Sequence, residues 1–332
     1  MSSTAQPISN IKIRRSRLHN IAEALIKRHR VGCPHVLQSL EDSPIRIVCI
    51  SDTHNRQPTI PPGDVLIHAG DLTENGSFDE VQAGVTWLSS QPHKYKVFVA
   101  GNHDVLLDDA FLATHPERRY GQTKTRQDLD WGDVIYLQDS VLTLEFPVER
   151  QREDAPNGST ADDPKSTRKR SITIFGSPWT PQYGTSAFQY HPNNSQHWEH
   201  VFATLKGNMD ILITHGPPKL HLDRRDFHRA GCPYLAEEIS RLRPRISVFG
   251  HIHASYGQEN VVLDSAQRIY EEAMIGWAGW SSIVWMTVLV AWTRIKALFS
   301  RRGDNRLTTF INAAVVAGPR NELQNEPIVV DI

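Results

Sequence analysis

Short runs rich in apolar residues recur along most of the chain and are separated by polar segments. Such runs are typical of buried strands, and we predict strands at 45–50, 64–69, 95–100, 134–137, 141–146, 172–176, 211–214, 246–249, 261–263, 308–314 and 328–330. Ser77 and Glu80 have the spacing of a capping box before an apolar stripe, and helices are also expected at 195–205 and 235–242. Strand–loop–helix units of this kind predict an α/β fold.

Three segments depart from this pattern and set the predicted domain boundaries. Residues 1–43 form a basic N-terminal extension, and residues 44–332 form the main domain. Within that domain, residues 151–170 are polar and lack an aliphatic run, which indicates a disordered insertion. Residues 265–307 form an apolar, largely helical insertion before the last strands.

The extension contains a basic amphipathic helix at 11–30. This stretch has seven lysines and arginines and a single acid, Glu23, and its aliphatic residues fall on one helical face. Gly32 and Pro34 would end the helix. A helix packed on the domain, a membrane-surface helix and a mitochondrial transit peptide all fit this pattern. The transit peptide ranks last because no processing site follows.

Residues 273–293 carry no charge and are long enough to span a bilayer, which takes about 20 apolar residues. A single crossing would separate strands that belong to one domain, so a spanning helix conflicts with the fold. We favour contact with a membrane surface through 273–302, because three tryptophans share a helical face and basic residues follow directly. The alternatives are a hairpin packed on the domain and a homodimer interface.

The composition is that of an ordinary globular protein. The formal net charge of -1 and the 39% hydrophobic content give no reason to expect a nucleic acid polymer as a partner. The three cysteines have no CxxC spacing, so we expect neither a disulfide framework nor a thiolate zinc site. Residues 1–10 are polar and lack an apolar stretch, so we expect a cytoplasmic protein, with or without a membrane contact.

Residues that can bind metal follow five of the predicted strands. The candidate ligands are Asp52, His54, Asp71, Asn102, His215, His251 and His253. Polar residues at the carboxyl ends of strands are how α/β folds build their sites. In the last motif, two histidines two positions apart would point the same way on an extended segment, and Gly250 permits a tight turn beside them.

These seven donors predict two metal ions. Oxygen and nitrogen donors without thiolate suit Mn, Fe or Zn. Seven ligands exceed the need of one tetrahedral site and suffice for two ions that share a bridging carboxylate. Metal pairs about 3.5–4 Å apart bind a phosphate and hold a bridging hydroxide that acts as the nucleophile. The ligand set therefore predicts hydrolysis of a phosphoester.

His103 lies beside a candidate ligand but is not needed to complete the set. We predict that it donates a proton to the leaving oxygen or stabilises charge on the phosphoryl group, with Asp104 orienting its ring. Asn102 and His103 are also expected to contact the substrate. Trp179 and Tyr183 lie in an aromatic loop that either lines the substrate pocket or packs on the sheet.

The ordered motifs DTH, GD, GNHD, THG and GHIH resemble those of the calcineurin-like metallophosphoesterases. More narrowly, LIHAGDLT, FVAGNHD, ITHGPP, VFGHIHASYG and NEPIVVDI resemble the metallophosphoesterase-domain-containing branch, which is related to class III cyclic-nucleotide phosphodiesterases. The resemblance covers 45–264 and 308–331. It implies a four-layer α/β/β/α sandwich of two mixed sheets.

The resemblance also implies a role for each candidate ligand. Asp52, His54 and His253 would bind the first metal. The second metal would be bound by three other residues, and Asp71 would bridge the two ions. These three residues are Asn102, His215 and His251. His103 would assist the leaving group.

One departure from the protein Ser/Thr phosphatases of this superfamily narrows the expected substrate. Those enzymes carry GDxVDRG and GNHE, whereas this chain has GDLTENG and GNHD. The arginine that would hold a phosphoprotein phosphate is absent from this stretch, so we expect small phosphodiesters of the cyclic nucleotide or aryl type. The alternatives are a phosphomonoesterase or protein phosphatase, and a non-catalytic, membrane-associated metal-binding scaffold.

Overall fold

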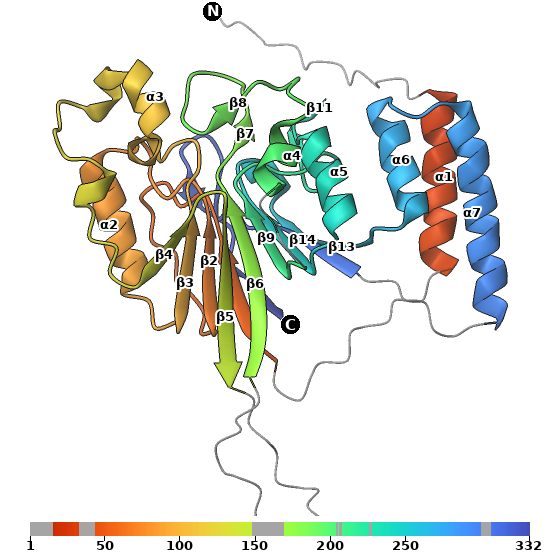
Figure 1. The fold of residues 1–332 in the computed structure, drawn as a ribbon, viewed down its shortest axis with the longest axis horizontal. Coiled ribbons are helices and arrows are strands. Elements are labelled where there is room, and N and C mark those ends of the chain that lie inside the picture. The colour runs from red at the N-terminus through yellow and green to blue at the C-terminus, as the bar shows by residue number, and fades with distance from the viewer. Residues whose placement is uncertain are drawn as a thin grey trace, which may run out of the picture. The chain divides into compact units, whose positions relative to one another are not determined.

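The computed structural model describes residues 16–32, 44–147, 169–203, 205, 208–225, 228–299 and 307–332 (Figure 1). Most of the predicted polar insertion lies outside these residues, and its last two positions begin a strand. The chain divides into two compact units. One contains residues 37–263 and 306–332, and the other contains residues 1–36 and 264–305.

The larger unit contains two mixed sheets. The first has the strand order β17-β1-β2-β3-β4, with β17 antiparallel to β1 and the other neighbours parallel. Its strands are β1 (Arg46–Ile50), β2 (Val65–Ala69), β3 (Tyr95–Val99), β4 (Val134–Leu137) and β17 (Ile328–Asp331). Because β1 to β4 are parallel, the loops that follow them leave from the same edge of the sheet.

The second sheet has the order β13-β14-β12-β9-β6-β5, and its four inner strands are parallel. The outer strands β13 and β5 are antiparallel to their neighbours. The bounds are β5 (Ser140–Pro147), β6 (Lys169–Ser177), β9 (Ile211–Thr214), β12 (Ile246–Phe249), β13 (Gly257–Val262) and β14 (Leu307–Asn312). A further bridge, Ser51 with Ala314, joins the ends of β1 and β14.

Helices cover the outer faces of both sheets. Helix α2 (Phe78–Ser89) begins with the predicted capping box at Ser77 and Glu80, and its buried face packs with the outer side chains of the first sheet. Helices α4 (His197–Phe202) and α5 (Pro233–Leu242) pack in the same way on the second sheet. A third apolar cluster fills the space between the sheets. The predicted α/β/β/α sandwich is therefore confirmed (Figure 1).

The remaining elements of this unit are short. Helix α3 (Asp109–Thr114) follows β3, and 3-10 turns occur at Val105–Leu107, Pro116–Arg119, Arg126–Asp128 and His253–Ser255. Two-residue strands form at β7 (Thr180–Pro181), β8 (Gln189–Tyr190), β10 (Arg224–Arg225), β11 (His228–Arg229), β15 (Val316–Ala317) and β16 (Glu322–Leu323). Cys49 and Cys232 are buried free cysteines.

The smaller unit contains three helices from distant parts of the chain. These are α1 (Arg17–Gly32), α6 (Ser265–Ile275) and α7 (Trp280–Phe299). Their shared core contains Ala22 and Ile26 from α1, Ala266, Ile269 and Ala273 from α6, and Ile283, Met286 and Val290 from α7. The N-terminal extension and the apolar insertion, which were predicted as separate segments, thus form one unit.

The uncharged window at 273–293 is not a continuous helix. Helix α6 ends at Ile275, where Gly276 adopts a φ of 87°, and α7 begins only at Trp280. Among the residues that the structure describes, no helix is long and apolar enough to cross a membrane. Helices α6 and α7 pack on each other and on α1.

Candidate functional site

The seven predicted ligands come together at one edge of the sandwich. Asp52 and His54 follow β1, Asp71 follows β2, and Asn102 follows β3. His215 follows β9 in the second sheet, and the pair His251 and His253 follows β12. The bridge between Ser51 and Ala314 ties the two sheets together at this edge, with Ser51 N donating to Ala313 O over 2.8 Å. Parallel strands in both sheets thus deliver their loops to one place.

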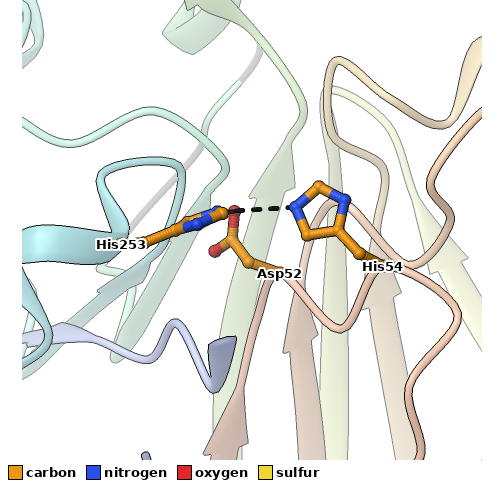
Figure 2. A group of neighbouring side chains, drawn as sticks. All are labelled: Asp52, His54 and His253. Atoms are coloured by element: carbon orange, nitrogen blue, oxygen red, sulfur yellow. Dashed lines mark hydrogen bonds and ion pairs between the residues drawn. The ribbon is translucent and has the colours of Figure 1, made fainter. Parts of the chain in front are cut away.

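The first group of possible ligands contains Asp52, His54 and His253, whose donor atoms all lie within 4.8 Å of one another. His253 Nε2 lies 3.1 Å from Asp52 Oδ1 and 3.4 Å from His54 Nε2 (Figure 2). Two imidazole nitrogens and a carboxylate oxygen therefore face a common point. Carboxylates and imidazoles are the ligands that Mn, Fe and Zn share.

The second group contains Asp71, His215 and His251, whose donor atoms also lie within 4.8 Å of one another. Asn102 joins them, because its Oδ1 lies 3.0 Å from His215 Nε2. The Asn102 Nδ2 atom donates to Ser186 Oγ, so the amide oxygen is turned toward His215.

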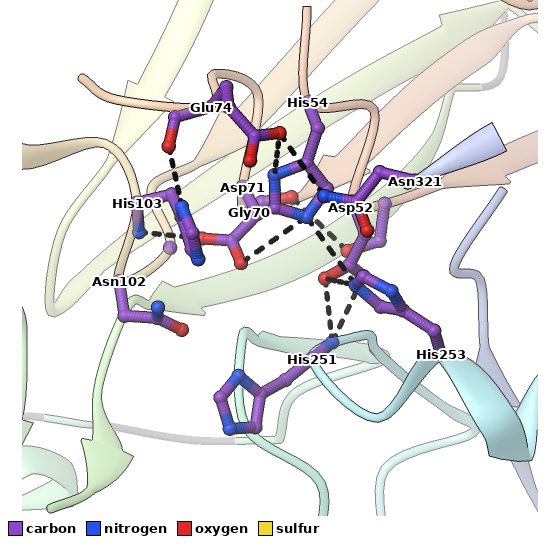
Figure 3. Close-up of polar contacts among 12 residues, drawn as sticks. Asp52, His54, Gly70, Asp71, Glu74, Asn102, His103, His251, His253 and Asn321 are labelled. Atoms are coloured by element: carbon purple, nitrogen blue, oxygen red, sulfur yellow. Dashed lines mark hydrogen bonds and ion pairs between the residues drawn. The ribbon is translucent and has the colours of Figure 1, made fainter. Parts of the chain in front are cut away.

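The Asp71 carboxylate lies between the two groups. Its Oδ2 atom is 3.2 Å from His215 Nε2 in the second group and 3.9 Å from His54 Nε2 in the first. Figure 3 shows Asp71 between the loops that carry His54 and Asn102. A carboxylate in this position can share its oxygens between two cations, which is the role that the resemblance implied for it.

The hydrogen bonds of His215 indicate that this cluster fits a cation. Its Nδ1 lies 3.0 Å from the carbonyl of Ala69, and because a carbonyl only accepts, Nδ1 carries the hydrogen. Nε2 then points a lone pair at two more acceptors, Asp71 Oδ2 and Asn102 Oδ1. Three lone pairs that face one another repel unless a proton or a metal ion lies between them.

The acids and histidines shift one another's pKa in a way that supports this view. Burial would raise the pKa of Asp71, but His215 and His103 hold it well below the usual range. Burial would lower the pKa of His215, but Asp71 outweighs burial and raises it to about 9. Burial also lowers the pKa of His251 to about 3, which keeps its imidazole neutral and able to donate a lone pair. The carboxylates are ionised and attract a positive charge.

Four of the candidate ligands have a left-handed backbone conformation. The φ angles of Asp52, His54, Asp71 and His251 are 54°, 44°, 53° and 67°. Non-glycine residues in this region cost about 1 kcal/mol or more each, and such residues concentrate at functional sites. The loops hold these side chains in place at the expense of local stability, which argues against a purely structural role.

Gly250 is required by space and not by its dihedral angles. A Cβ atom at this position would collide with the Asp52 carboxylate and the Ser51 side chain. The absence of a side chain lets the His251 N–H approach Asp52, to whose Oδ2 it donates over 2.9 Å. The predicted tight turn at Gly250 is thus a close approach of two loops.

His103 projects toward the same edge of the sandwich. Its backbone N–H donates to Asp71 Oδ1 over 2.8 Å, and its ring lies 4.8 Å from that of His54. The ring Nδ1 lies 2.6 Å from the Glu74 carbonyl and therefore carries a hydrogen (Figure 3). Burial lowers the pKa of His103, but Asp71 and the Glu74 carbonyl together raise it.

Asp104 does not orient the His103 ring as predicted, because the Glu74 carbonyl holds that ring. The buried Asp104 carboxylate instead accepts from the backbone N–H groups of Leu72, Thr73 and Gly101, and from the Thr73 hydroxyl. Burial and the nearby Asp71 charge raise its pKa to about 6. Asp104 therefore fastens the loop after β2 to the loop after β3, and it acts on the site through their positions.

A cavity of about 410 Å³ opens over the cluster. It is lined by His54, Asp71, Asn102, His103, Tyr183, Arg225, His251, Ile252, His253, Ala254, Ala317, Gly318 and Asn321. Tyr183 lies over His251, with a ring separation of 5.1 Å. Trp179 is placed elsewhere: its indole N–H donates to Asp139 Oδ2 and its ring packs against Phe188 and His197. Of the two aromatic candidates, Tyr183 thus lines the cavity and Trp179 packs in the core.

Three residues that the sequence did not single out contribute to the site. Arg225 enters the cavity from β10. Glu74 Oε2 lies 3.4 Å from His54 Nδ1, which turns His54 Nε2 toward the cluster, and Asn321 Nδ2 donates to the same Glu74 oxygen over 3.1 Å (Figure 3). A carboxylate behind a histidine ligand is a common arrangement at metal sites. Glu74 follows the Gly70-Asp71 motif by three positions, whereas Arg225 has no local signal.

Comparison with known proteins agrees with this geometry. Residues 45–255 match the family of calcineurin-like phosphoesterases. Human "Metallophosphoesterase domain-containing protein 1" is 35% identical over 229 residues, which make up 64% of this chain and 61% of that protein. A UPF0046 protein of Caenorhabditis elegans is 30% identical over 247 residues, with 70% of this chain and 78% of that protein covered.

A further relative has a different name. "Probable rhamnogalacturonate lyase C" of Emericella nidulans is 37% identical over 303 residues. These residues are 91% of this chain but only 26% of that protein. The present chain thus spans about a quarter of that protein and about three fifths of the human one.

Proposed function

Because the chain belongs to the calcineurin-like phosphoesterase family, we propose that it is a metal-dependent phosphoester hydrolase with two metal ions. The position of Asp71 Oδ2 between the two ligand groups carries this proposal. Asp52, His54 and His253 would hold one ion, Asn102, His215 and His251 would hold the other, and Asp71 would contact both. Donors of oxygen and imidazole nitrogen favour Mn, Fe or Zn.

The residues of the chain have separate tasks in this reaction. When bound, the metal pair supplies an activated water and neutralises charge on the phosphoryl group. Burial lowers the pKa of His103, but Asp71 and the Glu74 carbonyl raise it above its ordinary value and favour a proton at Nε2. From the wall of the cavity it can give this proton to the leaving oxygen. Asn102, through its amide, and His103 would also contact the phosphoryl oxygens.

We propose a small phosphodiester of the cyclic nucleotide or aryl type as the substrate. The cavity of about 410 Å³ is within the range of small-molecule sites, which is about 300–1,000 Å³. The Tyr183 ring offers a flat apolar wall for an aromatic group or a base. Arg225 offers a cation for an anionic oxygen. A phosphomonoester would use the same cation and is the alternative substrate class.

The chain corresponds to only a part of the protein named as a rhamnogalacturonate lyase, and we propose no lyase activity for it. The alignment covers 26% of that protein, while the ligand groups described above fall within the segment that matches the phosphoesterases.

Hydrolysis of a bis-aryl phosphate in the presence of Mn tests the proposed function. The wild-type chain should release the aryl alcohol, and the variants Asp71→Ala and His251→Ala should abolish this release. His191→Ala, which removes an exposed histidine that belongs neither to the ligand groups nor to the cavity lining, is the matched control and should keep full activity. Undiminished turnover in the Asp71 variant would remove that residue from the mechanism.

Metal analysis of the purified chain separates an enzyme from a scaffold. Two metal ions per chain, reduced in the Asp71→Ala variant, support the enzyme. A chain that binds metal but hydrolyses no phosphoester would instead support the non-catalytic metal-binding scaffold.

A further inference from the structure

Helix α7 leaves one apolar face uncovered. On one side, Ile283, Met286 and Val290 are buried in the core shared with α1 and α6. On the opposite side, the exposed face is formed by six residues whose exposed fractions range from 49% to 66%: Trp280, Val284, Trp285, Val288, Trp292 and Ile295. At 100° per residue these six cover an arc of about 140°. We call this arc the tryptophan face.

The chemistry of the tryptophan face matches a membrane–water interface. Tryptophan is enriched at this interface because its ring is apolar and its N–H is polar. Exposed contiguous apolar surface on a soluble unit commonly marks a binding site. Arg294 and Lys296 are exposed at the two edges of the arc near the end of α7. The Arg294 guanidinium donates to the Arg28 carbonyl on α1 over 3.2 Å, and the long side chain of Lys296 can reach lipid headgroups.

The charge of the smaller unit also favours an anionic surface. Residues 1–36 and 264–305 contain twelve lysines and arginines and five acids, whereas the whole chain has a formal net charge of -1. Positive charge is therefore concentrated in the unit that carries the tryptophan face. Basic residues near an anionic bilayer are attracted to its surface.

We infer that the tryptophan face binds the surface of an anionic lipid bilayer. Because the opposite side of α7 is occupied by the helical core, only one face of the helix can enter the lipid. Helix α7 would therefore lie in the plane of the interface, with the tryptophans at headgroup level and the basic edges against lipid phosphates or carboxylates. This inference does not depend on the proposed catalytic function.

Flotation of the full-length chain with vesicles tests the inference. One set of vesicles contains phosphatidylcholine alone, and the other contains phosphatidylcholine with phosphatidylserine. We expect the wild type to bind the anionic vesicles, and we expect its affinity for the neutral vesicles to be lower by about tenfold or more. Equal binding to both sets, or no binding to either, would overturn the inference.

A matched pair of variants locates the contact. Val288→Glu places a charge on the tryptophan face, and Val141→Glu places the same charge on β5 at nearly the same exposure, 49% against 48%. We expect Val288→Glu to weaken binding to anionic vesicles about tenfold or more, and Val141→Glu to leave it unchanged. Double substitution Trp285→Ala/Trp292→Ala should have the same effect as Val288→Glu.

Two further measurements keep the result unambiguous. The circular dichroism spectrum and the thermal unfolding of Val288→Glu should match those of the wild type. If they do not, the Trp285→Ala/Trp292→Ala variant is used in its place. Light scattering after gel filtration reports self-association. A wild-type dimer that Val288→Glu converts to a monomer, without any vesicle binding, would assign the face to a second copy of this chain and overturn the lipid inference.

Discussion

At the scale of single residues, His103 and the Glu74 carbonyl decide where a proton is held. The carbonyl fixes the hydrogen on Nδ1, so the protonated ring presents its second N–H, at Nε2, to the cavity. A proton donor in this position matters only when the leaving group is a poor one, because a good leaving group departs without protonation.

The effect of removing the His103 side chain should therefore depend on the leaving group. We expect His103→Ala to lower kcat by about 10²–10⁴-fold for an alkyl phosphodiester. With a nitrophenyl leaving group the loss should be much smaller. Steady-state kinetics over a series of leaving groups measures this difference. An equal loss across the series, with normal metal content, would contradict proton donation and leave charge stabilisation as the role of His103.

Arg225 and its neighbour Arg224 form a natural pair for testing substrate contact. Both are exposed on β10, but only Arg225 is among the residues that line the cavity. We expect Arg225→Ala to raise KM for a phosphodiester by about tenfold with little change in kcat, because it removes a charge-assisted hydrogen bond of about 1.5–3 kcal/mol partly screened by water. Arg224→Ala should leave KM unchanged. An equal rise in KM for the two variants would indicate that the positive charge of β10 attracts the anionic substrate without a direct contact from Arg225.

At the scale of elements, Asp264 joins two helices of the smaller unit. It caps α6 by accepting from Gln267 N, and its Oδ2 lies 2.5 Å from His29 Nε2 on α1. Although burial would raise the pKa of Asp264, its bonds to His29 and the helix N-terminus lower the pKa below its ordinary value. The charged carboxylate is thus favoured in the folded state.

Loss of this carboxylate should destabilise the helical unit. Asp264→Ala removes the cap and should cost about 1 kcal/mol or more, whereas Asp264→Asn can still cap and should cost less. Because the folded pKa lies below the unfolded one, the stabilisation is present above about pH 3.9 and is lost as the pH falls through the folded value. Thermal unfolding followed by circular dichroism at several pH values tests both points. Equal melting temperatures for the two variants would show that the Asp264 carboxylate stabilises the helical unit through its charge and not through the cap.

The strands and the ligand motifs could be predicted from the sequence because each is formed by a short, continuous stretch of residues. Asp52, Asp71 and His215 each follow an apolar run, and parallel strands bring such ends together. The partners of Asp104 and the entry of Arg225 into the cavity were not predictable. They depend on contacts between distant loops, such as the 2.8 Å bond from Gly101 N to Asp104, that leave no periodic signal.

The packing partners of the helices were also not predictable from the sequence. The amphipathic pattern of residues 11–30 predicted a helix but not what it packs against. Its partners α6 and α7 lie more than 200 residues later. The apolar window at 273–293 had no charge to mark its break, and Gly276 alone ends α6 with a left-handed φ. A hydropathy pattern reports how apolar a segment is, and packing decides which of its faces is covered.

At the scale of the whole molecule, the segment that carries α6 and α7 is inserted at a single point of the sandwich. Strands β13 and β14 are antiparallel neighbours, and Val262 pairs with Leu307 at the point where the chain leaves and returns. A short turn can therefore replace everything between these two residues without stretching either strand.

Removal of the helical unit should preserve hydrolysis. In a chain that lacks residues 1–36 and has 265–305 replaced by a short glycine-rich turn, we expect kcat/KM for a bis-aryl phosphate within about threefold of the wild type, since all candidate ligands lie in the larger unit. Kinetics with metal analysis measures this outcome. A folded, metal-loaded chain without activity would show that the helices contribute to catalysis.

The division of the helical unit between two distant segments also determines the order in which it can form during synthesis. Helix α1 leaves the ribosome more than 200 residues before α6 and α7. At about 5–20 residues per second, this delay is on the order of 10–50 s. During that time strands β1 to β4 of the first sheet can pair, while the apolar stripe of α1, with Ala22 and Ile26, has no native partner. The nascent chain therefore carries an uncovered, basic, amphipathic segment that a chaperone or a nearby anionic surface can bind before the protein is complete.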